Sequence, residues 1–303
     1  MNWTDLDTWI VLAGALTAMA CAVPGVFLLL NKQSMLGDAI SHAVLPGLAM
    51  GFIVSGTRNP LPMLAGAVLA GLFTGVVSSV IERRGRVETG ASLGVVFCSL
   101  FALGLILIRV AADHVDLDPG CVLYGALELA VVDSSPVPRI VWQSGAVLVL
   151  NLALATLFFK ELQLAAFDPR FAKASGIASG WIQQGLTIVT ALTTVVAFES
   201  VGSILVIAML IVPGASAMLL SRSVPGVLLW SLVVALCSAV MGHLLAITLA
   251  PACLGWLTGH HDLGSLNSAG MMAASAGFIF FTLLAGSHLV RNISTAIRNP
   301  EAS

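Results

Sequence analysis

The sequence predicts an all-α, polytopic membrane protein, and its composition, mean hydropathy and apolar runs each support this fold class. Of its 303 residues, 58% are hydrophobic and 9% are charged, and the mean hydropathy is +1.01. Soluble domains carry roughly 25% charged residues. An α-helix needs about 20 apolar residues to cross a bilayer, and nine runs in this chain are close to that length or longer. We therefore expect a single transmembrane domain over residues 1–303.

The nine apolar runs follow one another along the chain, with turn-forming or charged residues between them. They cover residues 8–30, 36–55, 61–81, 91–110, 139–159, 181–198, 201–221, 226–250 and 269–289. The breaks contain proline, glycine or charge, as in Arg58-Asn59-Pro60 and Val224-Pro225-Gly226. The number of helices is eight if the run at 36–55 or the run at 201–221 does not cross the membrane.

Pairs of glycines four residues apart predict where helices approach one another closely. Three such pairs stand in the apolar runs or at their edge: Gly47 and Gly51, Gly71 and Gly75, and Gly90 and Gly94. Small residues at this spacing let helix backbones touch inside a membrane. This pattern is general to membrane bundles and indicates no particular function.

The distribution of lysine and arginine predicts the orientation of the chain. With the N-terminus outside, ten of the 13 basic residues fall on the cytoplasmic side, and only Arg58, Arg109 and Arg139 fall outside. Basic residues concentrate in cytoplasmic loops, so this orientation is favoured over the reverse one. The acidic segment 111–138 is then external, whereas segment 160–180 and the C-terminus are cytoplasmic.

The run that begins at Ser34 with S-M-L-G-D-A-I-S-H-A-V-L-P-G places two ionisable side chains in an apolar span. Asp38 and His42 are four residues apart, so on a helix they share one face. A charge at membrane depth costs roughly 2.5–3.5 kcal/mol on insertion scales, and such residues normally face a partner or an aqueous path. Pro46 has no N–H, so it cannot donate the usual helical hydrogen bond to the carbonyl of His42.

Carboxylate, imidazole and a freed carbonyl together suit a divalent transition-metal ion. Asp38 and His42 are therefore the predicted metal ligands, and the alternative is a buried hydrogen bond that only fixes helix packing. Glu199 and His243 are further candidates for contact with the ion. Their alternatives are a carboxylate that faces water and a neutral histidine hydrogen-bonded between helices. The external cluster His260-His261-Asp262 either collects metal or is an ordinary exposed loop.

The motifs of nucleotide hydrolysis and of common metalloproteases are absent from the sequence. None of the three lysines follows a glycine, so G-x-x-x-x-G-K-[ST] is missing, and H-E-x-x-H is missing too. The five cysteines lack C-x-x-C spacing, and no basic cluster suggests nucleic acid. The chain is therefore not expected to be an enzyme or to hold a cofactor. Energy for transport must come from another chain or from an ion gradient.

Four segments resemble one known family. Residues 34–47 resemble the signature of ABC-type permeases that import manganese, zinc or iron. Residues 116–125, D-L-D-P-G-C-V-L-Y-G, are similar to the external segment of these permeases, particularly in the manganese/iron branch. The pattern F-D-P-x-x-A-x-x-x-G, with Asp168, Ala172 and Gly176, resembles their cytoplasmic coupling segment, and residues 201–215 resemble the span that follows it.

The resemblance implies a vitamin-B12-permease-like helical fold and a set of partners. These are a second permease protomer (an identical copy or a close paralogue), ABC ATPase subunits and an external metal-binding protein. It also implies that Asp38 and His42 of two protomers supply four ligands to the ion. Independently, Asp168-Pro169 predicts the start of a short helix and Gly176 its end. Such a helix either transmits motion from an ATPase or is an ordinary amphipathic connector.

The favoured interpretation is the permease subunit of an ATP-driven importer of a divalent transition metal in the bacterial cytoplasmic (inner) membrane. The likeness of residues 116–125 favours Mn²⁺, with Zn²⁺ or Fe²⁺ as alternatives. The main alternative function is a proton-coupled secondary metal transporter, in which Asp38 and His42 also relay protons. An intramembrane enzyme is disfavoured because a nucleophile and a zinc motif are both lacking.

Overall fold

The computed structural model describes residues 3–56, 60–111, 127–132, 137–176, 179–249 and 266–298. Within these ranges the chain is helical and contains no strand, and nine helices are long and apolar enough to cross a membrane. The helices are α1 (Asp5–Leu30), α2 (Met35–Ser55), α3 (Pro60–Gly85), α4 (Thr89–Ala111), α7 (Arg139–Leu157), α10 (Ser179–Val201), α11 (Ser203–Leu220), α12 (Val224–Leu249) and α14 (Ser268–Arg298). Three further helices are short: α6 (Leu127–Ala130), α8 (Phe159–Phe167) and α9 (Pro169–Ala174).

These nine helices confirm the predicted all-α fold, because each corresponds to one of the predicted apolar runs. The runs at 36–55 and 201–221 form the helices α2 and α11. Much of the predicted external segment 111–138, including residues 116–125, lies outside the described residues, and so do His260 and His261.

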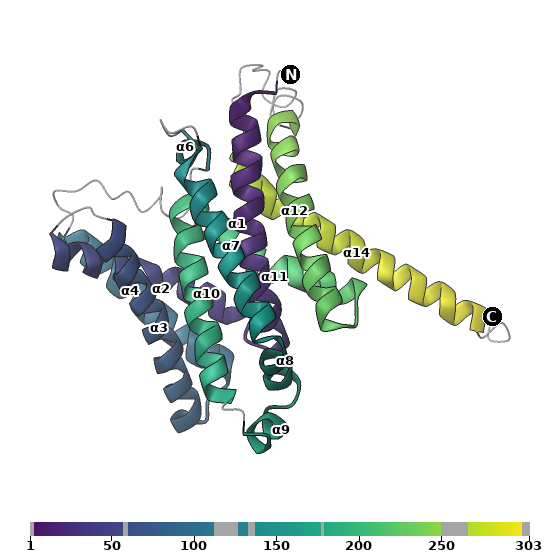
Figure 1. The fold of residues 1–303 in the computed structure, drawn as a ribbon, viewed down its shortest axis with the longest axis horizontal. Coiled ribbons are helices and arrows are strands. Elements are labelled where there is room, and N and C mark those ends of the chain that lie inside the picture. Colours follow the sequence, from purple (N-terminus) through teal and green to yellow (C-terminus); the bar gives the residue numbers. More distant parts are fainter. Residues whose placement is uncertain are drawn as a thin grey trace.

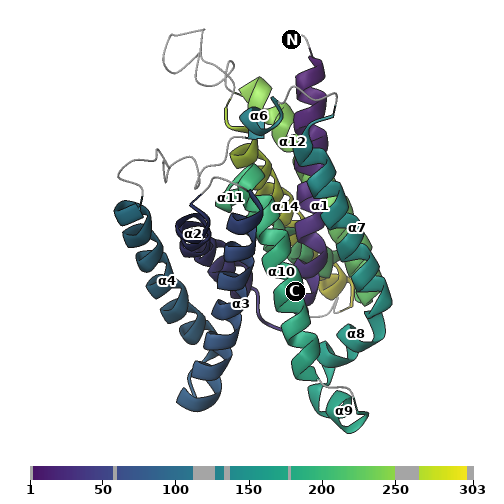
Figure 2. The same ribbon diagram turned by 60° about the vertical axis from the view of Figure 1, so that its left-hand side comes forward.

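The bundle divides into two groups of helices (Figures 1 and 2). Helices α2, α3 and α4 pack together on one side, while α1 packs against α7, α11 and α12 on the other. Helix α10 contacts members of both groups, and α11 of the second group also contacts α2, so these two helices join the groups. Helices α8 and α9 lie together at one end, next to the start of α10 (Figure 1).

Two glycine-rich faces hold α2 and α3 in place. A Cβ atom on Gly47 would lie 2.6 Å from the Cα of Ala67, and one on Gly51 would lie 2.6 Å from the carbonyl oxygen of Pro62. Both values are shorter than a side chain tolerates, so only glycine permits this approach of α2 to α3. A Cβ atom on Gly75 would instead lie 2.6 Å from the side-chain Cγ2 of Thr187, on α10. Gly94 instead has no atom within 4 Å of its would-be Cβ, so the pair at residues 90 and 94 forms no comparable contact within the chain.

Helix α1 is tied to its neighbours at the point where a proline interrupts it. Thr4 and Asp7 form a capping box at its start, and Pro24 lies inside it. Because Pro24 has no N–H, the carbonyl of Ala20 lacks its helical donor. The Nδ2 of Asn151, on α7, donates to this oxygen over 2.8 Å and to the hydroxyl of Thr193, on α10, over 2.9 Å. One buried amide thus joins α1, α7 and α10.

Replacing Asn151 with leucine is expected to destabilise the bundle by about 1–2 kcal/mol, because a buried carbonyl loses its donor in an apolar setting. Unfolding of the purified protein by a denaturing detergent measures this change. Ser144→Ala is the matched control on the same helix. Its hydroxyl bonds Thr17 over 2.7 Å, but Thr17 also donates to Ala13 O, so a smaller loss of about 0.5 kcal/mol is expected. Equal losses of stability in Asn151→Leu and Ser144→Ala would contradict the inference that the Asn151 amide stabilises the bundle more than an ordinary hydrogen bond between helices does.

Candidate metal site and coupling helix

Asp38 and His42 lie one turn apart at the start of α2, as their spacing predicts. The Nε2 atom of His42 is 3.3 Å from Oδ1 of Asp38, and the two side chains are 23% and 35% exposed, respectively. Asp38 stands in the first turn of the helix, where the helix dipole favours a negative charge. The pair is therefore pre-assembled on one helix and is still accessible from outside the chain's own core.

Two phenylalanines of α4 hold the imidazole of His42. The ring centroids of Phe97 and Phe101 both lie 5.2 Å from that of His42, the first tilted by 32° and the second nearly perpendicular at 80°. These rings restrict the imidazole without offering a ligand atom. The sequence analysis did not identify them, although their spacing of four residues along a predicted helix places both on one face.

Helix α4 also packs closely against Pro46. A Cβ atom on Gly104 would lie 2.7 Å from Cδ of Pro46, so α4 meets α2 directly at the proline. α2 continues through this position from Met35 to Ser55. The contacts of Phe97, Phe101 and Gly104 together fix where α2 lies along α4, and therefore fix the position of the Asp38–His42 pair.

The Asp38–His42 pair of one chain supplies only two ligand side chains. Among the described residues, no group of three or more His, Cys, Asp and Glu side chains could hold a metal ion. Glu199 belongs to the last turn of α10, and its side chain lies outside what the structure describes. A complete coordination shell therefore requires groups from outside this pair.

His243 occupies a different environment from the Asp38–His42 pair. It is 2% exposed, with Nε2 3.2 Å from Oδ1 of Asp7 and Nδ1 3.1 Å from the hydroxyl of Ser268. The Trp3 ring meets the imidazole edge-on at 5.8 Å. The structure thus places His243 in a hydrogen-bonded contact between α1, α12 and α14. Asp7 and Ser268 are partners that the sequence analysis did not name.

The short helix α9 begins and ends where the sequence predicts. Oδ1 of Asp168 accepts a hydrogen bond from the N–H of Phe171 over 2.9 Å, and Pro169 is the first helical residue. Asp168 is thus the N-cap, and proline at the next position costs no helical hydrogen bond. Gly176 follows the helix with φ of +81°, the left-handed conformation that glycine adopts most readily.

The two faces of this capped helix differ in exposure. Ala172 is completely buried, so its side chain packs inside the chain's own structure. Phe167 and Phe171, on either side of the cap, are 64% and 57% exposed. These two phenylalanine side chains therefore point away from the chain, and Ala172 anchors α9 from the other side.

Membrane-crossing helices, an Asp–His pair inside one of them and a capped helix at one end of the bundle define a multi-pass membrane transport protein. Comparison with known families agrees with this class. Residues 5–255 match the ABC 3 transport family, and the chain belongs to this family.

Individual relatives cover nearly the same length of chain. The manganese transport system membrane protein MntD of Bacillus subtilis is 38% identical over 287 residues, which are 91% of this chain and 90% of that protein. The zinc transport system membrane protein TroD of Treponema pallidum is 37% identical over 89% of this chain and 71% of its own. The solved structure of PsaBC from Streptococcus pneumoniae in complex with Fab has a TM-score of 0.73 at 28% identity. It covers 92% of this chain and 91% of its own.

Proposed function

We propose that this chain is the membrane-spanning permease subunit of an ATP-driven importer of a divalent transition-metal ion. The observation that carries the proposal is the Asp38–His42 pair, a carboxylate and an imidazole 3.3 Å apart within an apolar helix. Family membership supports the transport role, and the relatives named for manganese and zinc transport support the class of cargo. The ion is the transported substrate, and no resident cofactor is invoked.

The exposed position of the pair supports a site shared between two protomers. Two copies of the chain, or one copy and a close paralogue, would supply two carboxylates and two imidazoles around a two-fold axis. Four such donors form a closed shell for a bare divalent ion. In this arrangement, the Phe97 and Phe101 rings hold each imidazole so that its ligand nitrogen is presented with little loss of side-chain entropy.

The ligand atoms of the Asp38–His42 pair do not by themselves select one metal ion. Carboxylate and imidazole accept Mn²⁺, Fe²⁺ and Zn²⁺, and intrinsic affinity ranks Zn²⁺ above Mn²⁺ in such sites. Selection of Mn²⁺, the favoured cargo, would therefore depend on delivery by an external metal-binding protein as well as on the permease. This proposal sets the N-terminus outside the bacterial cytoplasmic membrane, as the basic residues predict.

The capped helix α9 is the proposed contact with the ATPase subunits. In the proposed orientation α8 and α9 lie on the cytoplasmic side, and α9 packs against α8 and α10. Exposed Phe167 and Phe171 supply apolar area for docking, while the caps at Asp168 and Gly176 make the helix rigid. Movement of α9 would be passed to α10, which contacts α2 and α3.

His42→Phe tests ligation without a change in packing. The phenyl ring is an apolar ring of similar shape to the imidazole that packs against Phe97 and Phe101, so the fold and the thermal stability are expected to change little. The ligand nitrogen is lost, so binding of Mn²⁺ to the purified permease should weaken by about 100-fold or more. Phe97→Leu is the companion variant, which keeps both ligands and loosens the ring contact. Unchanged Mn²⁺ binding in His42→Phe would show that the imidazole is not a ligand.

Uptake of Mn²⁺ into vesicles tests the proposed function as a whole. The permease is reconstituted with and without its ATPase subunits, the external metal-binding protein is supplied outside, and ATP is supplied on the cytoplasmic side. We expect uptake only when ATPase and ATP are both present. Uptake without the ATPase, driven by an imposed proton gradient, would instead establish the secondary-transporter alternative.

A further inference from the structure

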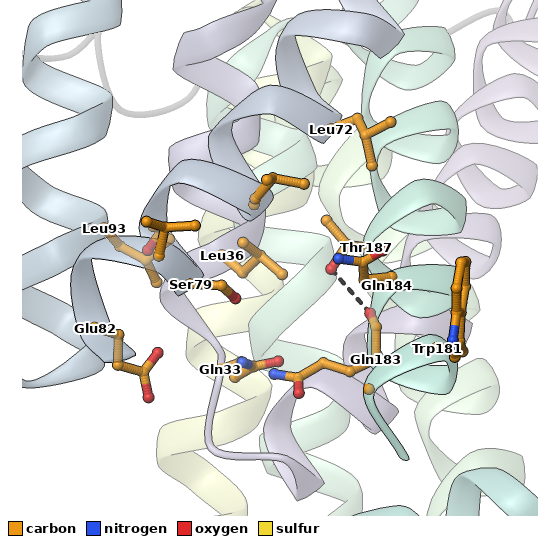
Figure 3. A pocket seen from close by; sticks show the side chains of 15 residues that line it. Gln33, Leu36, Leu72, Ser79, Glu82, Leu93, Trp181, Gln183, Gln184 and Thr187 are labelled. Carbon is orange, nitrogen blue, oxygen red and sulfur yellow. Dashed lines mark hydrogen bonds between the residues drawn. The ribbon is translucent and has the colours of Figure 1, made fainter. Parts of the chain in front are cut away.

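A cavity of about 290 Å³, lined by both apolar and polar side chains, lies between the start of α2, the end of α3 and the start of α10. Neither Asp38 nor His42 lines it. Figure 3 shows Glu82, from α3, at one side of this cavity and Gln183 and Gln184, from α10, at the other, with Gln33 between them in this view. In the proposed orientation these helix ends face the cytoplasm.

Several side chains that line this cavity carry oxygen atoms that could bind a cation, and two of these side chains lack a hydrogen-bond or ion-pair partner among the described residues. The Oε1 atom of Gln33 is buried and has no hydrogen-bond partner within the described structure. A buried acceptor without a donor is unfavourable unless a ligand or water satisfies it. Glu82 is half-buried, and no described cationic side chain lies within ion-pair distance of its carboxylate. Among the described residues, the cavity therefore combines a carboxylate that has no ion-pair partner with a carbonyl oxygen that has no hydrogen-bond donor.

The cavity lies near the Asp38–His42 pair along the sequence of α2, because Leu36 lines the cavity and precedes Asp38 by two residues. Leu36 and Leu93 line the cavity and are only 5% and 4% exposed. Phe97, which contacts His42, follows Leu93 by four residues, or about 6 Å along α4. The cavity wall is also formed by Gly180 and Trp181, which lie at the start of α10, just after the helix α9. A shift of α10 would therefore change the shape of the cavity.

We propose that this cavity is a second, weaker divalent-cation site, through which the ion is released to the cytoplasm. Its role in release depends on the proposed transport function, whereas its ability to bind a cation does not. None of its lining residues is a histidine or a cysteine. Carboxylate and amide oxygens are ligands for hard cations, and Mg²⁺ and Mn²⁺ bind to such groups while keeping several waters. Six waters occupy roughly 180 Å³ at about 30 Å³ each, so the cavity can hold a hydrated ion.

This chemistry separates the two sites by their response to Mg²⁺. An imidazole ligand favours transition metals over Mg²⁺, whereas an oxygen-only site with retained waters discriminates little. Excess Mg²⁺ is therefore expected to displace Mn²⁺ from the cavity and to leave Mn²⁺ at the Asp38–His42 pair. A site of this kind would release the ion to the cytoplasm readily, because it binds the ion weakly.

The test is titration of Mn²⁺ into the purified full-length permease, with free Mn²⁺ measured by electron paramagnetic resonance, with and without excess Mg²⁺. We expect a tight class of Mn²⁺ sites and a weaker class that Mg²⁺ displaces. Glu82→Gln should weaken the Mg²⁺-sensitive class by about tenfold or more and leave the tight class unchanged. Gln33→Leu should weaken the same class, which provides a second variant if Glu82→Gln does not fold. Glu88→Gln is the control, because Glu88 is an exposed carboxylate near the same helix ends that does not line the cavity.

Variants of Asp38 and variants of the cavity are expected to affect different classes of Mn²⁺ sites. Asp38→Asn should remove the tight class and leave the Mg²⁺-sensitive class, and retention of the tight class would overturn the Asp38–His42 site instead. Absence of a Mg²⁺-sensitive class in the wild type would overturn the cavity site. So would the same affinity of that class in Glu82→Gln, Gln33→Leu and Glu88→Gln.

Discussion

Replacing Asp38 with asparagine is expected to abolish metal uptake while the protein still folds and assembles. The amide has nearly the shape of the carboxylate but carries no charge to offset that of a divalent ion. Even substitutions outside the ligand shell weaken metal sites by about 10–100-fold, so uptake should fall by at least about 100-fold. The measurement is Mn²⁺ uptake by reconstituted vesicles, together with gel filtration of the variant and its ATPase association.

Asp5→Asn is the matched control for Asp38→Asn. Asp5 also stands in the first turn of a helix, and it is exposed. Asp5→Asn therefore makes the same chemical change as Asp38→Asn but away from the Asp38–His42 pair. We expect wild-type uptake from this control. Wild-type uptake from Asp38→Asn would exclude the carboxylate as an essential ligand. Failure of Asp38→Asn to fold would show that the Asp38–His42 contact is structural, as in the packing alternative.

Features that depend on neighbouring residues along one helix could be predicted from the sequence. The Asp38–His42 contact follows from a spacing of four residues, and the ends of α9 follow from the conformational preferences of Asp168-Pro169 and Gly176. Within the described residues, the nine helices that are long and apolar enough to cross a membrane follow from the length of their apolar runs, because backbone groups in lipid must be paired within the segment.

Contacts between helices could not be predicted in the same way. Asp7 and His243 are 236 residues apart, and no local pattern pairs them. The glycines at 47 and 94 look alike in sequence, but only Gly47 meets a neighbouring backbone. Apolar side chains pack against one another and against lipid with similar energies, so the partner of each face depends on the shape of the whole bundle. For the same reason, the phenylalanines around His42 and the burial of Ala172 emerged only from the structure.

Replacing Gly176 with valine is expected to disconnect the ion site from the ATPase. The φ of +81° at this position strains a β-branched residue by about 1–2 kcal/mol, although no atom lies within 4 Å of the added Cβ. The conformation that ends α9 should then be roughly 5- to 30-fold less populated. We expect Mn²⁺ binding at Asp38 and His42 to be retained, ATPase association to weaken and uptake to be lost. All three are measured on one preparation.

Gly176→Asn separates the backbone conformation from the mere addition of a side chain. Asparagine tolerates the left-handed conformation better than other non-glycine residues, so this variant should keep ATPase association and uptake near the wild-type values. Gly145→Val adds the same side chain in open space within α7, where the backbone is helical, and should also retain ATPase association. If Gly176→Val retains full uptake with the ATPase bound, the helix α9 is only a connector. Loss of Mn²⁺ binding in Gly176→Val would show instead that the segment supports the ion site itself, because the coupling proposal requires that site to survive.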